Sequence, residues 1–447
     1  MKETFCIIGG DAAGMSAAMK IRRALPKASI TVFEMGDTFS YAQCGLPYFI
    51  SDLITEPEKL IARKRSTFQE KYHIHAFPRH QVLSVDPARQ TVRVLDLEQK
   101  KEKELDYDKL LLATGASPVF PDVEGRELTG VFSLKTIKDG EQIKRWSHQP
   151  EVQQVAIVGG GYIGLEMVES FHMLGKEVHL FDHGQRVAKV FDPEFSLQAQ
   201  EEMLNKGVHL HLQEKVIAIQ GKDGKAAAII TENGTFPVQL VLFAIGVRPN
   251  SSLLTEQKAL TGAKGAVLVD TQLQTSLANV YAAGDCATQY HRIKGRQDYI
   301  PLGTNANKQG RIAGANMSGS SLSYAGTVGT SILRILDLEL ARTGLSTSEA
   351  EEMGLTFESV SLDTLHRAGY YPDARKQHIK LLYERESGLL LGGQVSGFGV
   401  DKPIDVLATA LHAGMSISDL EELDLAYAPP FSSVWSPVQQ TARRAKI

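Results

Sequence analysis

A unit of strand, glycine-rich turn, helix and strand occurs twice in the sequence, and this repeat constrains the fold more than any other feature. In the first copy, residues 4–35, an apolar strand from Thr4 to Ile8 leads into the turn Gly9-Gly10-Asp11-Ala12-Ala13-Gly14. A helix to about Leu25 and a strand over residues 30–34 follow. Glycines in such a turn let the backbone approach a pyrophosphate, which the N–H groups of the following helix then bind.

The second copy covers residues 154–182. It has the turn Gly159-Gly160-Gly161-Tyr162-Ile163-Gly164 and a helix to about Leu174. A single copy is explained by a tight connection in a doubly wound sheet. Two copies in the same context predict two dinucleotide-binding sites.

Each unit carries an acidic residue about 20 positions after its last glycine, namely Glu34 and Asp182. We predict that both accept hydrogen bonds from ribose hydroxyls. Asp11 occupies the position of a middle glycine, where a carboxylate facing a pyrophosphate is unfavourable, so we expect it to point away or to act through water. Asp182 favours NADH because it would repel a 2'-phosphate. His183 and Arg186 could partly offset that repulsion, and use of NADPH stays open.

Further apolar segments of the kind that parallel sheets bury on both faces occur at 110–115, 241–246 and 280–285. From about residue 324 polar and apolar residues alternate, and two helical stretches follow near 404–413 and 417–422.

These segments predict an α/β protein with two Rossmann-like dinucleotide-binding domains and a C-terminal α+β domain. We predict one dinucleotide-binding domain from residues 1–115 and 247–324, and the other from residues 116–246. Residues 325–447 would form the C-terminal domain.

Composition narrows the class of protein. With 447 residues, 43% hydrophobic content and a net charge of -4, the chain reads as a globular protein with no general attraction for nucleic acid or membrane surfaces. No apolar run reaches the roughly 18 residues that span a bilayer. We therefore expect a cytoplasmic protein. The sequence predicts no metal site, and three cysteines are too few for a disulfide framework.

Cys44 lies in the segment from Ser40 to Tyr48, a few positions after the acidic residue of the first unit. It would open a helix, whose dipole is expected to stabilise its thiolate. A single cysteine is more often a buried small hydrophobe. The glycine and proline residues around Cys44 favour a redox role instead, whereas Cys6 and Cys286 are expected to serve packing.

Six motifs carry a family resemblance that covers essentially the whole chain: SYAQCGLPYFI around Cys44, LLATGASP at 111–118, AIGVRPN at 244–250, YAAGDCA at 281–287, PLGTNANKQGR at 301–311 and LAYAPPFSSVWSP at 425–437. The sequence resembles the single-cysteine branch of the pyridine nucleotide-disulfide oxidoreductases. That branch contains coenzyme A disulfide reductases, NADH oxidases and NADH peroxidases. The glutathione-reductase-like fold of that family agrees with the domains predicted above.

The resemblance implies FAD in the first domain, NADH or NADPH in the second, and homodimers in which C-terminal residues complete the active site of the partner subunit. The cofactor-binding residues that we predict are Gly9, Gly10, Asp11, Ala12, Ala13, Gly14, Glu34, Ala113, Thr114, Gly115, Gly159, Gly161, Tyr162, Ile163, Gly164, Asp182, Gly246 and Asp285.

Departures from the family pattern favour the coenzyme A disulfide reductase type. Two-cysteine members carry a second cysteine five residues after the first, where this chain has Phe49. The oxidised form of Cys44 must then be a sulfenic acid or a mixed disulfide with a small thiol such as coenzyme A. Oxidases and peroxidases typically carry a histidine where this chain has Ala12. In coenzyme A disulfide reductases, tyrosines of the partner serve near the cysteine. The candidates here are Tyr427 and either Tyr370 or Tyr371.

Ser16, Lys20 and Arg23 fall on one face of the first helix. In coenzyme A disulfide reductases the equivalent face contacts the phosphates of the coenzyme, and Lys71 lies near another such contact. The alternative interpretation is that these three residues form an ordinary solvent-exposed face of the helix. Arg22 lies off this face and is expected to be ordinary surface. Two more substrate-binding candidates that the resemblance implies are Ser40 and Gln43.

The sequence thus predicts reduction of coenzyme A disulfide, or of a related small disulfide, by NAD(P)H through FAD and a Cys44–coenzyme A mixed disulfide. The alternatives are an NADH oxidase that works through a Cys44 sulfenic acid, a persulfide or polysulfide reductase, and a non-catalytic flavin-bound redox sensor.

Overall fold

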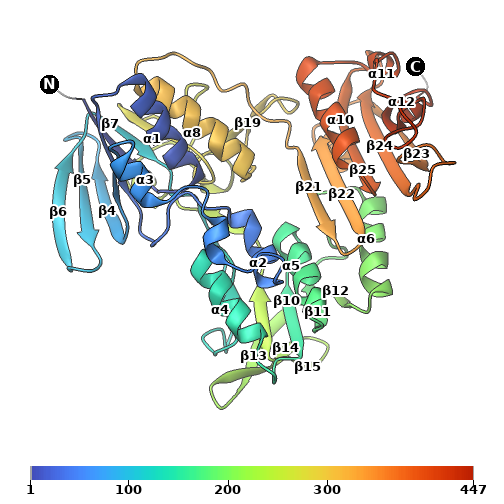
Figure 1. Ribbon diagram of the computed structural model, residues 1–447, viewed down its shortest axis with the longest axis horizontal. Helices are drawn as coiled ribbons and strands as arrows, with labels where there is room; N and C mark the ends of the chain where they lie inside the picture. The colour runs from blue at the N-terminus through green and yellow to red at the C-terminus, as the bar shows by residue number, and fades with distance from the viewer. Residues whose placement is uncertain (1–2, 446–447) are drawn as a thin grey trace.

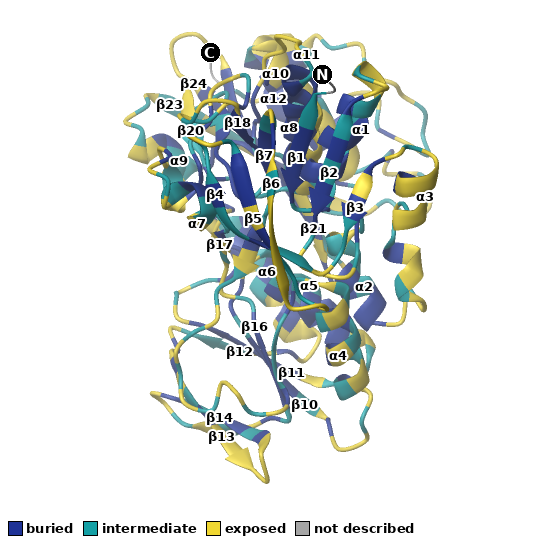
Figure 2. Ribbon diagram, turned by 90° about the vertical axis from the view of Figure 1, so that its left-hand side faces the viewer, coloured by how far each residue is buried: buried dark blue, intermediate teal, exposed yellow. Residues whose placement is uncertain are grey.

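The computed structural model describes residues 3–445, which form three lobes (Figure 1). The first lobe is built on a parallel five-stranded sheet in the order β18-β7-β1-β2-β3. Its strands run in register, with Ile7 opposite both Val32 and Leu111. The central strands β1 and β7 are buried apart from their first residues, as Figure 2 shows, whereas the edge strand β3 begins with an exposed residue. The bounds are β1 Thr4–Ile8, β2 Ser29–Phe33, β3 His75–Phe77, β7 Lys109–Leu112 and β18 Val280–Ala282.

Helices α1 (Ala12–Ala24) and α8 (Gly303–Met317) pack against each other beside this sheet. Small residues bring their backbones together. A Cβ atom on Gly310 would lie 2.1 Å from the carbonyl oxygen of Ala13, and one on Gly314 would lie 2.5 Å from that of Ala17. The rest of the lobe comprises η1 Gln43–Gly45, α2 Leu46–Ile50, η2 Pro57–Leu60, α3 Arg65–Glu70, β4 His80–Asp86, β5 Thr91–Asp96, β6 Lys101–Asp106, α7 Ser252–Thr255, η3 Ala263–Gly265, β19 Gln289–His291 and β20 Arg296–Asp298.

The second lobe repeats this design with a parallel sheet in the order β12-β11-β10-β16-β9 and a smaller antiparallel sheet, β13-β14-β15. Its bounds are β9 Val131–Ser133, α4 Ile137–Ser147, β10 Gln154–Val158, α5 Tyr162–Met173, β11 Glu177–Asp182, α6 Pro193–Asn205, β12 His209–Leu212, β13 Val216–Lys222, β14 Lys225–Thr231, β15 Thr235–Pro237 and β16 Leu240–Phe243. The repeat read from the sequence is therefore present as two parallel sheets, which confirms the predicted fold class for this part of the chain.

Two short antiparallel strands, β8 (Ala116–Pro118) and β17 (Val247–Pro249), carry the chain into and out of the second lobe. They lie beside the residues where the sequence places the domain edges. The edges as such remain predictions.

The third lobe is an antiparallel sheet in the order β21-β22-β25-β24-β23 with helices beside it, the α+β arrangement expected from residue 325 onward (Figure 1). Its elements are β21 Ser331–Ile335, β22 Leu338–Gly344, α9 Thr347–Glu352, β23 Phe357–Leu365, β24 Lys376–Glu384, β25 Leu390–Gly397, α10 Asp401–Ala413, α11 Ile417–Glu421 and α12 Pro437–Ala442. Among residues 3–445, no helix combines the length and apolar character needed to cross a membrane.

One apolar cluster joins all three lobes. It combines Leu46 and Phe49 of α2 with Ile143 of α4, Leu165 of α5 and Leu333 of β21. Helix α2, which directly follows Cys44, is thus held at the junction of the lobes, between α4 and α5 (Figure 1).

Candidate functional site

The first glycine-rich turn is closely packed against the sheet. A Cβ atom on Gly9 would lie 2.1 Å from the Ala113 carbonyl oxygen, and one on Gly14 would lie 1.9 Å from that of Gly9. The Glu34 carboxylate accepts hydrogen bonds from Gly10 N (2.8 Å) and Gly36 N (2.7 Å). Glu34 therefore braces the turn in addition to lying where a ribose is predicted to bind.

Asp11 directly precedes α1 without capping it through its side chain, because its carboxylate is directed toward the Cys44 segment. It accepts hydrogen bonds from Tyr41 N (3.1 Å) and from Gln43 Nε2 (2.7 Å). Burial raises its pKa to about 6, although both hydrogen bonds oppose that rise. These contacts direct the carboxylate toward residues 41–43, and its position relative to a bound pyrophosphate stays a prediction. The hydrogen bond to Asp11 also engages the side-chain amide of Gln43, which is a predicted substrate contact. Ser40, the other such candidate, donates its backbone N–H to the Gly10 carbonyl.

Asp182, at the end of β11, is buried, and its negative charge is balanced by an ion pair with Lys189. Its carboxylate accepts hydrogen bonds from Gly160 N (2.9 Å), Gly184 N (2.7 Å) and Lys189 Nζ (2.6 Å). Burial raises the pKa of Asp182, but these three donors together hold it below its usual value. The sequence argument that Asp182 repels a 2'-phosphate is weakened, because Lys189, which that argument missed, supplies the compensating charge.

The second turn leaves room where a dinucleotide is expected. A Cβ atom on Gly161, at the start of α5, would meet no atom within 4 Å, and the same holds for Gly115 and Gly246. The space beside Gly161, at the N-terminus of α5, is therefore open, and binding of a pyrophosphate there stays a prediction. Tyr162 is less free, because its hydroxyl is hydrogen-bonded to Ser331 Oγ at 2.5 Å. Ile163 packs partly buried against the core of this lobe.

Thr114 ties the two connecting strands together at the end of β7. Its Oγ1 donates to the Asn250 carbonyl (2.6 Å), and Asn250 Nδ2 donates to the Thr114 carbonyl (3.0 Å). Ala113 N in turn donates to the Ile8 carbonyl. The predicted cofactor residues 113–115 thus lie where the two nucleotide-binding lobes meet.

Cys44 lies in η1 and is the exposed thiol of the chain, since Cys6 and Cys286 are buried. The helix behind it is fixed by two bonds to the second lobe, from Ser170 Oγ to the Pro47 carbonyl (2.9 Å) and from Lys144 Nζ to the Phe49 carbonyl (2.8 Å). Phe49, in place of a partner thiol, is buried beneath the Lys144 ammonium, 4.3 Å from its ring centre. All three cysteines are free.

The expectation that a helix start stabilises the Cys44 thiolate is wrong in this structure. Desolvation raises the Cys44 pKa, and the carboxylates of Glu166 and Asp285 raise it further, while Lys135 partly opposes them. Helix α2 is five residues long, so its dipole is small beside two nearby carboxylates.

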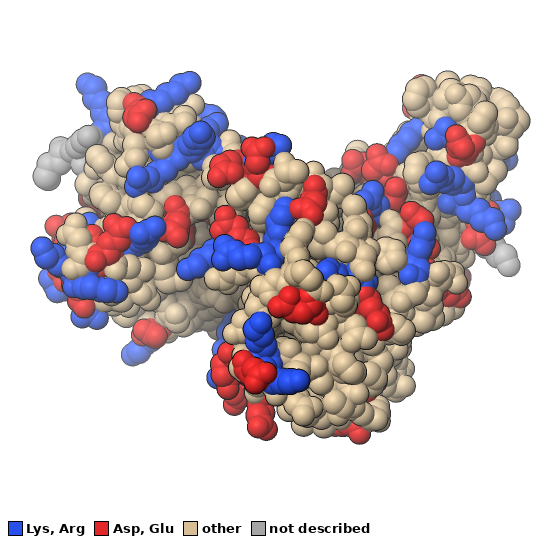
Figure 3. Space-filling view, turned by 60° about the horizontal axis from the view of Figure 1, so that its bottom comes forward, with Lys and Arg blue, Asp and Glu red and all other residues tan. Residues whose placement is uncertain are grey.

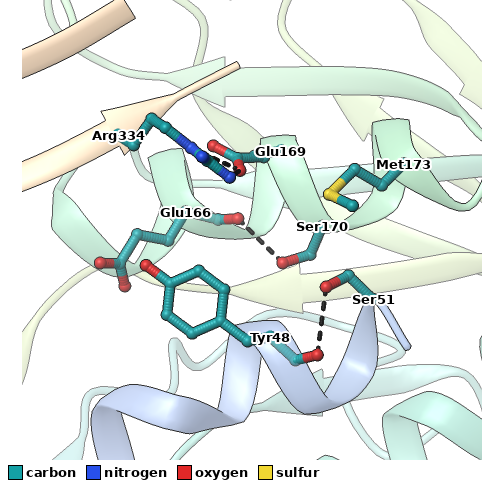
Figure 4. A pocket seen from close by; sticks show the side chains of 7 residues that line it. All are labelled: Tyr48, Ser51, Glu166, Glu169, Ser170, Met173 and Arg334. Atoms are coloured by element: carbon teal, nitrogen blue, oxygen red, sulfur yellow. Dashed lines mark hydrogen bonds and ion pairs between the residues drawn. The ribbon is translucent and has the colours of Figure 1, made fainter. Parts of the chain in front are cut away.

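Glu166 is a candidate that the sequence analysis missed. It lines a pocket whose other side chains are Tyr48 of α2, Ser51 directly after α2, Glu169, Ser170 and Met173 of α5, and Arg334 of β21 (Figure 4). Burial, and then the neighbouring Glu169, raise the pKa of Glu166 to about 7. A residue of the second lobe whose charge acts on Cys44 can therefore gain or lose a proton near neutral pH.

Lys135 is a second residue that the motifs did not indicate. Its Nζ lies 3.8 Å from the carboxylate of Asp285, a predicted FAD contact. Burial raises the pKa of Asp285, and Lys135 lowers it. The backbone of Lys135 also accepts a long hydrogen bond from the Tyr41 hydroxyl (3.4 Å). Lys135, a cation of the second lobe, thus lowers the pKa of two carboxyl groups of the first lobe, Asp11 and Asp285.

The predicted basic face of α1 is only partly free. Ser16 Oγ donates to Asn307 Oδ1 (2.8 Å), while Lys20 is half-buried and Arg23 exposed. Lys71 is exposed beside Tyr72. The expectation that Arg22 is ordinary surface is wrong. Its guanidinium donates to the carbonyl oxygens of Pro26 (2.6 Å) and His73 (2.8 Å), which ties the end of α1 to the chain after α3.

The tyrosine candidates separate clearly. The hydroxyls of Tyr370 and Tyr427 lie 3.4 Å apart, and their residues are 77% and 45% exposed. Tyr371 instead packs its ring against the guanidinium of Arg367. Tyr370 is therefore the member of the pair that lies with Tyr427. Other exposed apolar residues of the same segment are Phe431, Val434 and Trp435.

Comparison with known proteins agrees with this arrangement. The pyridine nucleotide-disulphide oxidoreductase family matches residues 3–310, and its dimerisation domain matches residues 330–438. The chain is 38% identical to an NAD(P)H coenzyme A polysulfide/persulfide reductase of Pyrococcus horikoshii, over 100% of this chain and 99% of that protein. It is 28% identical to a coenzyme A disulfide reductase of Staphylococcus haemolyticus, over 95% of each.

Among solved structures, an NAD-dependent persulfide reductase from A. fulgidus superposes with a TM-score of 0.95 at 35% identity, over 98% of this chain and 82% of that chain. Two dinucleotide-binding lobes with a third, antiparallel domain define a flavin- and nicotinamide-dependent oxidoreductase. The chain belongs to the pyridine nucleotide-disulphide oxidoreductase family and carries that family's dimerisation domain. The predicted fold and the predicted FAD and NAD(P)H cofactors are confirmed at the level of the family.

Proposed function

We propose that this protein reduces the sulfur–sulfur bond of coenzyme A disulfide, or of a related small disulfide, at Cys44, with NAD(P)H as the electron donor. The observation that carries the proposal is that Cys44 is exposed at the junction of the lobes, with buried Phe49 where a second thiol would stand. A lone thiol of this kind must take its disulfide partner from the substrate.

Bound FAD would supply the two-electron chemistry that links the nicotinamide to this thiol. Cys44 attacks one sulfur of the substrate, forms a mixed disulfide with coenzyme A and releases the first coenzyme A thiol. Two electrons from NAD(P)H cleave that mixed disulfide, release the second thiol and restore the Cys44 thiolate. One NAD(P)H and one proton are consumed for each disulfide, and two thiols are formed.

The leaving thiolate needs a proton, and two groups support that step. The exposed Tyr370–Tyr427 pair would serve the active site of the partner subunit in a homodimer, consistent with the dimerisation domain. Glu166, with a pKa of about 7, is the carboxyl of the same chain whose charge raises the Cys44 pKa most. A reducing compartment such as the cytoplasm suits a thiol that cycles in this way.

Substitution of Cys44 tests the proposal. The Cys44→Ser variant should keep its FAD absorbance and lose NAD(P)H oxidation with coenzyme A disulfide by at least about 10³-fold, because only the thiolate forms the mixed disulfide. Cys6→Ala is the matched control, since Cys6 is a buried core residue, and it should retain turnover. Mass spectrometry of the unreduced protein should find a coenzyme A adduct that Cys44→Ser lacks. Full turnover by Cys44→Ser would refute the assignment.

A second candidate is reduction of coenzyme A persulfide at the same thiol. The observation that favours it is the higher identity to proteins named for persulfide reduction, 38% and 35%, than to one named for coenzyme A disulfide reduction, 28%. Turnover of the persulfide would release sulfide, whereas turnover of the disulfide releases only thiol. Comparing kcat/KM for the two substrates in one preparation decides between them.

The site supports an NADH oxidase function less well than a disulfide or persulfide reductase function. Ala12, at the start of α1, provides no proton-donating side chain beside the first turn. Oxygen consumption that stays far below disulfide-dependent or persulfide-dependent oxidation of NAD(P)H is the expected result.

A further inference from the structure

A cluster of histidines lies at the edge of the second lobe, away from the redox centre. Strands β11 and β12 run parallel, with His179 opposite His209 and Phe181 opposite His211. Because side chains of alternate residues share one face of a strand, Glu177, His179 and His209 point to the same side. One ligand atom from each of these three lies within 4.8 Å of the others.

The distances within this group match those around a small cation. Glu177 Oε1 lies 3.4 Å from His179 Nε2 and 3.2 Å from His209 Nε2. Donor atoms bound tetrahedrally at the usual 2.0–2.1 Å from zinc are separated by about 3.3 Å. The His209 side chain is exposed, so it has room to rotate toward a shared ion.

The second observation is an unpartnered nitrogen in the middle of the group. His179 is 8% exposed, and its Nε2 is buried with no hydrogen-bond partner among the described residues. At 3.4 Å its contact with Glu177 is too loosely arranged to count as one. Leaving a buried polar nitrogen unsatisfied is costly, and a bound cation would remove that cost.

A relay behind the cluster orients this nitrogen. His211 Nε2 lies within hydrogen-bond distance of His179 Nδ1, at 3.1 Å. Glu214 Oε2 lies 3.6 Å from His211 Nδ1, too far for a hydrogen bond but close enough for its charge to favour a proton on that nitrogen. With a proton on His211 Nδ1, His211 Nε2 accepts and His179 Nδ1 donates. The lone pair of His179 Nε2 then faces the Glu177 carboxylate. Two electron-rich atoms that face each other in this way are stabilised by a cation between them, and a carboxylate–histidine relay of this kind commonly holds metal-bound imidazoles.

We propose that Glu177, His179 and His209 bind one divalent transition-metal ion of the zinc type, oriented by His211 and Glu214. Two imidazoles and one carboxylate leave a coordination position open to solvent or to an exogenous ligand. Glu177 is at the beginning of β11 and Asp182 at its end, so the ion would lie about 16 Å from the predicted nucleotide contact. The ion would therefore clamp the edge strand β12 to β11 and take no part in hydride transfer. This site is independent of the function proposed above.

Zinc binding to the intact flavoprotein tests this proposal. The Cys44→Ser background removes the one exposed thiol that would also bind zinc. After chelation and gel filtration, equilibrium dialysis against micromolar Zn²⁺ with elemental analysis should give one equivalent per chain and a saturable rise in Tm. Adding His209→Ala should weaken binding by at least 10-fold, and Glu177→Gln should do the same.

His75→Ala is the matched control, because His75 is also an exposed histidine on a strand, in the sheet of the first lobe. It should bind zinc as the parent does, and all variants should keep their FAD. Absence of stoichiometric zinc in the parent, or equal zinc affinity in the His209→Ala and His75→Ala proteins, would overturn the proposal. His209 is half exposed, so loss of zinc by unfolding is checked directly by the FAD content and Tm of the metal-free variant.

Discussion

Cys44 and Glu166 come from different lobes, and the Glu166 carboxylate is one of the groups that raise the pKa of Cys44. Desolvation and the Glu166 carboxylate both raise the pKa of Cys44. The pKa of Glu166 is itself raised to about 7 by burial. Below pH 7 Glu166 is therefore mostly neutral and does not oppose the thiolate. Above pH 7 Glu166 is mostly charged, and its charge opposes formation of the Cys44 thiolate.

The Glu166→Gln variant should expose this coupling. Because glutamine is neutral at every pH, the Cys44 pKa should fall, and alkylation of Cys44 by iodoacetamide should be about 3–10-fold faster than in the parent between pH 7.5 and 8.5. At pH 5.5 the two rates should be equal, since Glu166 is protonated there. Rates measured on the reduced flavoprotein across this range give the comparison, with exposed Glu232→Gln as the control. Parallel pH profiles for Glu166→Gln and the parent would contradict the coupling.

At the scale of residues, sequence reasoning located what local motifs encode and missed what long-range packing supplies. Cys44 and the glycines of both turns were predictable, because the conformation of a turn depends on residues that are neighbours in sequence. Lys135, Glu166 and Lys189 were not, because their partners Asp285, Cys44 and Asp182 are met only in the fold. Lys189 is the nearest of these in sequence, seven residues from Asp182, and a lysine after an acidic ribose residue was a usable signal.

Among the elements, the α1–α8 contact positions the first glycine-rich turn. Gly310 lets α8 approach the Ala13 carbonyl so closely that a Cβ atom would lie 2.1 Å from it. Ala13 is part of the turn where FAD is predicted to bind. Any widening of this contact therefore moves the turn as well as loosening the core.

The Gly310→Ala variant should be destabilised by about 1–3 kcal/mol, since the added methyl group meets backbone that cannot rotate away. It should also lose FAD more readily on dilution. Thermal unfolding followed by flavin fluorescence measures both effects. Lys308→Ala, at an exposed position of the same helix, should behave like the parent. A Gly310→Ala protein with unchanged Tm and FAD retention would show that the helices have room to move apart.

The elements themselves were largely predictable, because apolar strands and glycine turns repeat with a fixed order. The helix predicted to about Leu25 ends at Ala24, and that predicted to about Leu174 ends at Met173. The short strand pair β8–β17 was not predicted. Its three-residue strands are far apart in sequence, with Val247 opposite Pro118 at one end and Pro249 opposite Ala116 at the other, and no local pattern encodes such a pairing.

At the scale of the whole molecule, the C-terminal lobe exposes aromatic residues that nothing in the described chain covers. Tyr370 and Tyr427 share a hydroxyl contact at 3.4 Å, and both are exposed, as is Phe431. Acidic and basic side chains are interspersed over the face shown in Figure 3, so this face presents no patch of a single sign of charge. Aromatic residues in a dimerisation domain are the natural centre of an interface between two copies of the chain.

A hybrid dimer tests whether those tyrosines act on the partner's Cys44. Tyr427→Phe alone should lower turnover by at least about 10-fold if the tyrosine supplies a proton. Co-expression with two different tags yields a dimer with one Cys44→Ser subunit and one Tyr427→Phe subunit. If the tyrosine acts across the interface, this dimer holds one wild-type site, made of Cys44 from one chain and Tyr427 from the other, and should show about half of the parent's activity. If the tyrosine acts within its own chain, the only active cysteine lacks its tyrosine, and the hybrid should show no more than half of the low Tyr427→Phe activity. Full activity of Tyr427→Phe homodimers would instead exclude Tyr427 as the proton donor, whichever chain it serves.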